Sequence, residues 1–494
     1  MLDLVRSMKN NLAPINQIPS EVFSLLPEYL EGYHGDEGLI SMSHVCRSWR
    51  ELLIARSSLW AHLDCKNTDK TRVYIERSKS SPLELSLFKY RSADYIEDGI
   101  LLVVPHISRL KSLSIDGRVD LLRFLTPYLS CPIPLLRELT IAFNCDPAPV
   151  LDGMLFNGDL SSLCSLSLGG VITHLPWKNL SKLTTFELCR IPGDKISITQ
   201  LLNFFEDANR LSDIMLRDSI PTLSNALPGR VVSLPYLKKF TIFAEDPVHP
   251  ILLNHLSIPT GASLTMEFTL RVGESPLPDL LPNTLNNLRN ISSISSVDLF
   301  LGDFDKFVRL DGPNGGLYML GQWIDFDGAH GFTVNNQVLR SLSRFDLSGT
   351  QRLVVTQYES STVDTVDNSA LYHILSRMKD LRTLTLSLAQ YNDLPFILAL
   401  DPAQNPSKRV LCPKLEEFTL HVWEPKSLEI EELKSMVKER ASAGRKLSSI
   451  TIHDLDEVML ESEIFELKKF IAHVDHIVGE DPAKRDSTSE GGGK

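Results

Sequence analysis

One hydrophobic phrase recurs along most of the chain. It consists of a leucine, two variable residues, a second leucine, one variable residue and a third leucine, with other aliphatic residues or Phe as substitutes. Eleven copies begin at Leu110, Leu136, Leu163, Leu183, Leu211, Leu237, Ile294, Leu342, Leu381, Leu415 and Leu447. The alternation at the end of the phrase predicts a short β-strand with one buried face in each copy. A related phrase at Leu83, Leu85 and Leu87 predicts an earlier strand.

The spacing of these copies is typical of a repeat protein. The first six begin 26, 27, 20, 28 and 26 residues apart, within the period of about 20–29 residues of leucine-rich repeats. Later spacings of 57, 48, 39, 34 and 32 residues indicate insertions or unrecognised copies. Between copies, apolar periodicity predicts helices over residues 196–209, 371–378 and 427–440.

These patterns predict an α/β fold. Residues 81–456 would form an irregular, curved solenoid similar to leucine-rich repeats, with helices on its convex side. The alternative is a general α/β domain in which the phrase recurs by chance. The turn sequence Asp-Gly-Pro-Asn-Gly-Gly at 311–316 predicts a β-hairpin within an insertion at about 301–334. Residues 457–480 are expected to form a capping helix, and residues 481–494 a disordered tail.

Residues 14–80, which follow an extension of residues 1–13, predict a compact helical segment. Apolar residues at helical spacing follow Pro19, namely Val22, Leu25, Leu26, Tyr29 and Leu30. A Gly-rich break at 32–38 precedes a second amphipathic stretch at 39–56. Helices this short are unstable alone, so they are expected to pack on each other or on a partner.

The same segment carries a recognisable set of motifs. It reads Ile18-Pro19-Ser20-Glu21-Val22-Phe23, then Leu26 and Leu30, then Val45-Cys46-Arg47-Ser48-Trp49, and closes on Leu59-Trp60. These elements resemble the F-box, which opens with an aliphatic-Pro-x-Glu-aliphatic step and ends V-C-x-x-W…L-W. The resemblance covers about 50 of the 494 residues. The stretch 31–38 is longer and more Gly-rich than the usual connection between the first two helices of that family, so a tolerated insertion and a lost partner both stay open.

The resemblance implies a three-helix F-box that binds a Skp-type adaptor and, through it, a cullin and a RING subunit. The adaptor-binding residues would be Ile18, Pro19, Val22, Leu26, Leu30, Val45, Cys46 and Trp49. These apolar side chains are also too many for a small helical segment to bury alone, and Trp is a common interface anchor. Internal packing is an equal alternative for Trp49 and the favoured one for Trp60.

Composition narrows the function classes. The net charge of −12 disfavours nucleic acid and anionic membranes as partners, and no apolar run reaches the length of a membrane span. The seven cysteines form no C-x-x-C pair, which argues against disulfides, zinc clusters and a RING, and suits the cytoplasm or nucleus.

No catalytic motif is present: there is no Walker loop, no G-x-S-x-G elbow and no H-E-x-x-H pair. Asp325-Phe326-Asp327-Gly328 lacks the other ligands of a calcium loop. We therefore expect no enzyme, no cofactor and no metal, and a role in bringing a substrate protein to a ubiquitin ligase. The alternatives are a non-ligase repeat scaffold with a vestigial F-box and, less favoured, a hydrolase with a dispersed site.

Substrate recognition would fall to the variable residue between the last two leucines of each copy, which faces away from the core. The candidate substrate-binding residues are Glu187, Met215, Thr241, Asp298, Asp346, Thr385 and Thr419. Three of them are acidic, which favours a neutral or basic partner, whereas plain β-propensity explains the threonines equally well.

Overall fold

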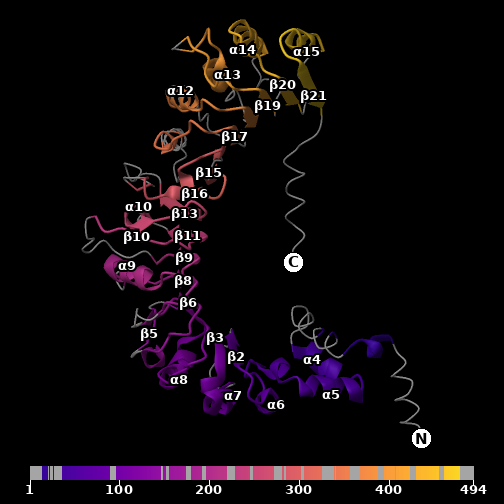
Figure 1. Cartoon of the computed structure of the whole chain (residues 1–494), viewed down its shortest axis with the longest axis vertical. Helices are drawn as coiled ribbons and strands as arrows, with labels where there is room; N and C mark the ends of the chain where they lie inside the picture. The colour runs from indigo at the N-terminus through magenta and orange to yellow at the C-terminus, as the bar shows by residue number, and fades with distance from the viewer. Residues whose placement is uncertain are drawn as a thin grey trace. The chain divides into compact units, whose positions relative to one another are not determined.

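The computed structural model describes residues 14–19, 22, 26, 36–88, 96–145, 148–151, 155–173, 180–191, 196–219, 229–244, 249–271, 281–282, 285–301, 305–324, 339, 341–356, 368–387, 394–405, 408–422, 430–454 and 461–478. The chain divides into two compact units, Met1–Leu211 and Ser212–Lys494. Each combines helices with a mostly parallel β-sheet (Figure 1). Among the described residues, every helix is too short or too polar to cross a bilayer.

The sheet of the first unit is parallel throughout, and each strand pairs with the next one along the chain. Its strands are β1 (His62–Leu63), β2 (Leu83–Phe88), β3 (Leu110–Gly117), β4 (Glu138–Phe143), β6 (Ser165–Gly169) and β8 (Thr185–Cys189). The short strands β5 (Val150–Leu151) and β7 (Ile172–Thr173) form a separate pair. The strand expected at Leu83–Leu87 is therefore confirmed as β2.

Helices connect and precede these strands. They are η1 (Pro14–Gln17), α4 (Asp36–Ser43), α5 (Arg47–Ala55), η2 (Ser57–Trp60), α6 (Thr68–Ser78), α7 (Glu97–Val103), η4 (Val104–Arg109), α8 (Val119–Leu129), η5 (Leu155–Gly158) and α9 (Ile198–Asp207). Helix α9 confirms the prediction at 196–209. Ser197 and Gln200 form a reciprocal capping box at its start, which satisfies two of its unpaired backbone donors.

The second unit contains a longer sheet. Its strands are β9 (Asp213–Arg217), β11 (Lys239–Ala244), β13 (Ser263–Arg271), β14 (Ser296–Leu301), β15 (Asp305–Asp311), β16 (Gly316–Ile324), β17 (Arg352–Thr356), β18 (Thr383–Ser387), β19 (Glu417–Val422), β20 (Ser449–Asp454) and β21 (His473–Val478). A separate pair joins β10 (Val232–Ser233) to β12 (Leu256–Ser257). The helical segments are α10 (His249–Asn254), η7 (Arg289–Ile291), α12 (Asn368–Arg377), α13 (Leu394–Leu400), α14 (Ile430–Ser442) and α15 (Glu461–Lys468). Helices α12, α13 and α14 lie on one side of strands β17 to β20 (Figure 1).

The predicted hairpin is present, and it lies inside the sheet. β15 and β16 pair antiparallel, and β14 pairs antiparallel with β15. Because β16 also pairs with β13 and β14 with β17, both in parallel, the spatial order is β13, β16, β15, β14, β17. We call β14–β15–β16 the meander. It is the one antiparallel part of the sheet among the described strands.

The repeated phrase forms strands because its apolar positions alternate. In β4, Leu139, Ile141 and Phe143 are buried, whereas Glu138 and Thr140 are not. Burying one such side chain contributes about 2 kcal/mol. Ten of the eleven copies overlap a strand that the structure describes.

The prediction of a strand from the copy at Leu342 is wrong. Leu342, Phe345 and Leu347 are buried in a helical turn and the loop after it, and the strand of that repeat is β17. The buried Thr350 stands where the other copies have their first leucine, so the phrase was hidden. In the same way, Gly261 stands at the first position of the phrase before β13, so the phrase could not be recognised there.

Two helix predictions are also corrected. The segment 457–480 is not one helix, because α15 ends at Lys468 and β21 follows and pairs in register with β20; a longer helix would leave the edge of β20 unpaired. The segment 39–56 contains two helices, α4 and α5, because the hydroxyl of Ser43 bonds the carbonyl of Ile40 at 2.7 Å and ends the first. The predicted tail, 481–494, lies outside the described residues.

Arginines join successive repeats of the second unit. Arg440 is fully buried and donates from Nη1 to Leu411 O at 2.8 Å and from Nη2 to Cys412 O at 2.9 Å. Arg377 bonds the carbonyls of Ser343 and Phe345 in the same way. These charge-assisted bonds satisfy backbone acceptors in turns that the sheet ladder does not reach.

Replacing Trp60 is predicted to destabilise the first unit. The ring is 1% exposed, packs edge-on against Tyr74 at 5.1 Å and donates from Nε1 to Leu53 O at 2.8 Å. Trp60→Ala would cost about 3–5 kcal/mol because it leaves a large cavity, seen as a lower thermal midpoint by circular dichroism. Phe465→Ala is the control, because that side chain is 65% exposed; a change no larger than that of the control would contradict the prediction.

Candidate functional site

Exposed aliphatic side chains gather in the helical N-terminal segment. Of the large apolar residues that are exposed in the described part of the chain, five lie between residues 15 and 52: Ile15, Val22, Ile40, Val45 and Leu52. Val45 is the most exposed of the five, at 59%. An isolated exposed aliphatic side chain needs no explanation, whereas several in one short helical segment make that segment a candidate interaction surface.

Most of the predicted adaptor-binding residues are accessible. Pro19, Val22 and Val45 are exposed, and Ile18, Leu26, Cys46 and Trp49 are half-buried. Leu30 lies outside the described residues. Val45 and Cys46 lie in the turn between α4 and α5, where Cys46 is the extended residue directly before α5, and Trp49 lies in the first turn of α5.

Trp60 packs internally, as expected. Arg77 covers its face, with the guanidinium carbon 4.3 Å from the ring centroid. η2, which contains Trp60, packs on α5 and α6, and β1 follows it and pairs with β2. This packing joins the N-terminal helices to the sheet of the first unit.

The second unit offers a different surface, the outward face of its sheet. In-register pairing lines up the outward residues in rows across the strands. The central row runs through Met215, Thr241, Thr265, Tyr318, Arg309, Asp298, Val354, Thr385, Thr419, Thr451 and Asp475. Threonine dominates on β18 to β20, whereas large or charged side chains replace it at the meander.

Aromatic rings cover the outward face of the meander. The rings of Phe300 and Phe307 stack with centroids 5.1 Å apart, and Phe307 lies 5.7 Å from Tyr318. Phe307 and Phe300 belong to the outward row next to the central row, which also contains Leu320 and Glu267. Burial raises the pKa of the Glu267 carboxyl. This stretch of the face is therefore less hydrated than an ordinary sheet surface, and it suits apolar side chains of a partner.

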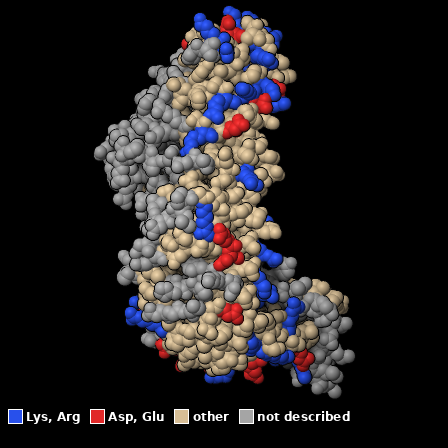
Figure 2. Space-filling model, turned by 60° about the vertical axis from the view of Figure 1, so that its left-hand side comes forward, with Lys and Arg blue, Asp and Glu red and all other residues tan. Residues whose placement is uncertain are grey.

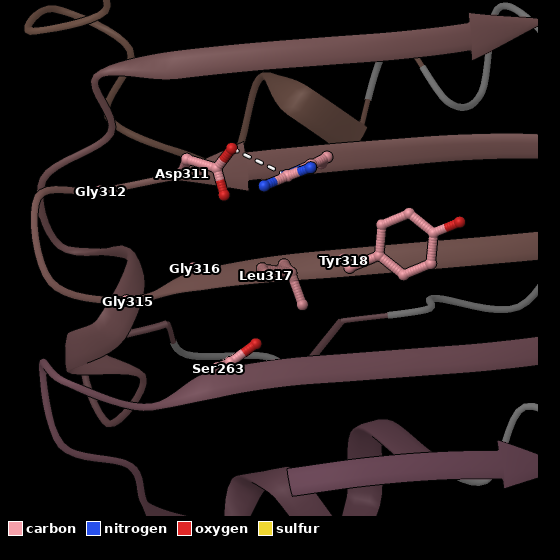
Figure 3. Close-up of a pocket in the computed structure, with 8 residues that line it drawn as sticks. Ser263, Asp311, Gly312, Gly315, Gly316, Leu317 and Tyr318 are labelled. Carbon is pink, nitrogen blue, oxygen red and sulfur yellow. Dashed lines mark ion pairs between the residues drawn. The ribbon is translucent and has the colours of Figure 1, made fainter. Parts of the chain in front are cut away.

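A pocket of about 460 Å³ lies beside the rings, at the N-terminal end of β16. Figure 3 shows the ring of Tyr318 and the Arg309–Asp311 ion pair on neighbouring strands, with Ser263 on the strand below. Gly312, Gly315, Gly316 and Leu317 complete the lining. A Cβ atom on Gly316 would lie 2.6 Å from Leu310 O, so glycine is required there and leaves a gap between Ser263 and Asp311.

Two Arg–Asp pairs lie on this part of the sheet face, and the first of them lines the pocket. Arg309 Nε donates to Asp311 Oδ2 at 2.8 Å, and Arg352 Nη1 donates to Asp298 Oδ1 at 2.9 Å. Both terminal amino groups of Arg309 are without a partner among the described residues. Asp311 thus fixes the guanidinium while its outer edge stays available, an arrangement suited to a carboxylate or carbonyl group of a bound segment.

The structure places some of the predicted substrate-binding residues on the outward sheet face of the second unit and others elsewhere. Met215, Asp298, Thr385 and Thr419 stand in the central row. Thr241 stands there too, but it is 3% exposed between Met215 and Thr265, so it cannot contact a partner.

One acidic candidate, Asp346, needs correction, and another, Glu187, already has a hydrogen-bond partner. Asp346 is not on a strand; its carboxylate accepts from the backbone nitrogen of Ser348 at 3.0 Å, and this bond lowers the pKa of its carboxyl. Glu187, on β8 of the first unit, accepts from the Ser167 hydroxyl at 3.0 Å. The expected preference for a basic partner loses its support here, because Asp346 is displaced and Asp298 is already paired with Arg352.

The residues that sequence reasoning missed lie on the meander and on β13: Ser263, Phe300, Phe307, Arg309, Asp311 and Tyr318. The turn at 311–316 predicted two strands but not their place between β13 and β17. The signal that could have found these residues is the alternation Lys306–Phe307–Val308–Arg309–Leu310, which puts Phe307 and Arg309 on one face.

Comparison with known proteins identifies no relative. No family model matches the chain, and no curated protein sequence matches it.

No three His, Cys, Asp or Glu side chains in the described part of the molecule are grouped to hold a metal ion. The calcium-like segment Asp325–Gly328 lies outside the described residues. All seven cysteines are free, and burial raises the pKa of the Cys65 and Cys412 thiols to about 12.

Those two cysteines are predicted to resist alkylation in the folded protein. A pKa raised from 9.0 to about 12 leaves about 1000-fold less thiolate at pH 8, and the thiolate is the nucleophile. Iodoacetamide followed by peptide mass spectrometry should label the exposed Cys131 first and Cys65 and Cys412 last, with all seven labelled in guanidinium. Early labelling of Cys65 or Cys412 would show that their surroundings open.

Proposed function

We propose that this chain is a substrate-recruiting F-box subunit of a ubiquitin ligase. Its helical N-terminal segment would bind a Skp-type adaptor, and through it a cullin and a RING subunit. The observation that carries the proposal is the group of exposed aliphatic side chains in the segment with the F-box-like motifs, Val22 and Val45 above all. Such a group is stable in water when a partner covers it.

The array after that segment supports a substrate-binding role. Consecutive parallel strands with helices between them are what leucine-rich-repeat-like solenoids are built from, and we propose such a solenoid for each unit. The outward sheet face of the second unit, with its aromatic meander and its pocket, would hold the target protein. Aromatic and Arg side chains are the types that dominate the energy of protein interfaces.

In this proposal the chain performs no chemistry itself. It contributes proximity, because holding a target beside the transfer machinery converts an encounter in solution into a reaction within one complex.

A repeat scaffold with a vestigial F-box is the second candidate. The observation in its favour is that residues 36–38, part of the Gly-rich stretch, belong to α4, so the entry to this helix differs from the family pattern. Such a protein would keep the outward sheet face and lose adaptor binding.

The deciding experiment is co-purification of the full chain with its host's Skp-type adaptor. The test variant is Val22→Asp with Val45→Asp, and the matched control is Val150→Asp with Val231→Asp, two valines that are also exposed. We expect a one-to-one complex that the test variant weakens at least about 100-fold, because each buried charge at an interface core costs more than about 1.4 kcal/mol.

The control should bind like the wild type. Failure of the folded wild-type chain to bind the adaptor would reject the ligase proposal and favour the scaffold. Equal loss in both variants would show that the motif segment is not the contact.

A further inference from the structure

Basic side chains gather where strands β18 to β21 begin. The segments that lead into these strands carry Lys379 and Arg382, then Lys414, then Arg445 and Lys446, then Lys468 at the end of α15 and Lys469 after it. All seven side chains are exposed. Figure 2 shows Lys and Arg in a band across the upper part of the molecule, where Figure 1 places these elements.

Most of these cations form no ion pair with a carboxylate that the structure describes. Lys414 pairs with Asp380 at 2.6 Å, and Lys469 pairs with Glu466. Among the described residues, no carboxylate pairs with the side chains of Lys379, Arg382, Arg445, Lys446 or Lys468. We call these five residues, together with Lys414, the basic edge.

Acidic residues occur in the same turns, but their negative charges do not neutralise the charges of the basic edge. Asp380 is used by Lys414, and Glu417 accepts from the Thr383 hydroxyl at 3.2 Å. Glu416 lies next to Arg382 in the ladder, and Asp346 is close enough to Lys379 for the two charges to attract each other. The basic edge therefore keeps a surplus of positive charge in a chain whose net charge is −12.

The sheet ladder extends into these turns and aligns them. Glu416 N donates to Arg382 O at 2.9 Å, Ser448 N to Glu416 O at 2.7 Å, and His473 N to Ser448 O at 3.3 Å. Neighbouring strands lie about 4.8 Å apart, so the four entries span about 15 Å. Neighbouring cations are thus within or near the Debye length of about 8 Å, and their potentials overlap.

We propose that the basic edge binds an acidic segment of a partner protein. About five extended residues span 15 Å at roughly 3.3 Å each. Asp and Glu side chains of such a segment would meet Lys379 and Arg382 at one end and Lys446 and Lys468 at the other. This surface is distinct from the outward sheet face and from the adaptor-binding helices, so the proposal goes beyond the function proposed above and does not depend on it.

A protein segment fits the basic edge better than nucleic acid. A nucleic acid continues in both directions as a dense polyanion, and the net charge of the chain would repel the parts that leave the basic edge. Asp380 and Glu416 within the turns add to this repulsion. An acidic peptide can place its carboxylates opposite the cations and continue as a neutral chain.

The test uses fluorescence anisotropy with a labelled octa-glutamate peptide and the full-length chain. The edge variant is Lys379→Glu, Arg382→Glu, Lys446→Glu. The control variant is Arg123→Glu, Lys182→Glu, Lys438→Glu, three exposed cations elsewhere with the same change in net charge. All six substitutions are on the surface, and circular dichroism checks the fold of each variant.

We expect the wild type to bind the peptide and the edge variant to bind it at least about tenfold more weakly, since three attractive charge pairs become repulsive. The control should stay within about twofold. No binding by the wild type, or equal loss in both variants, would overturn the proposal. Tighter binding of a single-stranded oligonucleotide of equal charge would also overturn it, in favour of a nucleic-acid surface. Adaptor co-purification is independent of these outcomes, so failure of either proposal can be recognised separately.

Discussion

Both sheets depend on a pairing register that no strand can change by one residue. In the second unit Leu384, Phe418 and Ile450 stand opposite one another, and all three are buried. Because side chains alternate along a strand, a slip of one position would move every buried residue of that strand to the outward face. With about 2 kcal/mol for each buried aliphatic or aromatic side chain, two such residues on one strand already make the slip prohibitive.

The fixed register also determines where polar chemistry can occur. Thr385, Thr419 and Thr451 line up because the buried rows beside them do. The same alignment continues into the entry turns, where Glu416 bonds the backbone of Arg382. Basic side chains that are scattered in the sequence, from Lys379 to Lys468, are thereby brought to one edge. The hydrophobic pattern thus sets the position of charges that contribute nothing to the core.

The regular part of this fold could be predicted from the sequence because apolar and polar residues alternate locally in each strand. Prediction failed where one residue departs from the pattern. Thr350 is buried in place of a leucine and concealed β17, and Gly261 concealed β13. The candidate site was harder to predict, because it depends on which strands pair. The closeness of Ser263 and Tyr318 follows from the pairing of β13 with β16, which has no local signal.

The meander interrupts the parallel order of the sheet, and the residues on its outward face differ from those on the neighbouring strands. The threonines of β11, β13 and β18 to β20 in the central row give way to Tyr318, Arg309 and Asp298. Neither a Phe300–Phe307 stack on the outward face nor a glycine gap at 316 helps to bury the core. Natural sequences depart from local consistency mainly where function requires it. The departure at the meander, rather than the threonine rows, is therefore the part of the sheet face on which selection by a binding partner is expected to have acted.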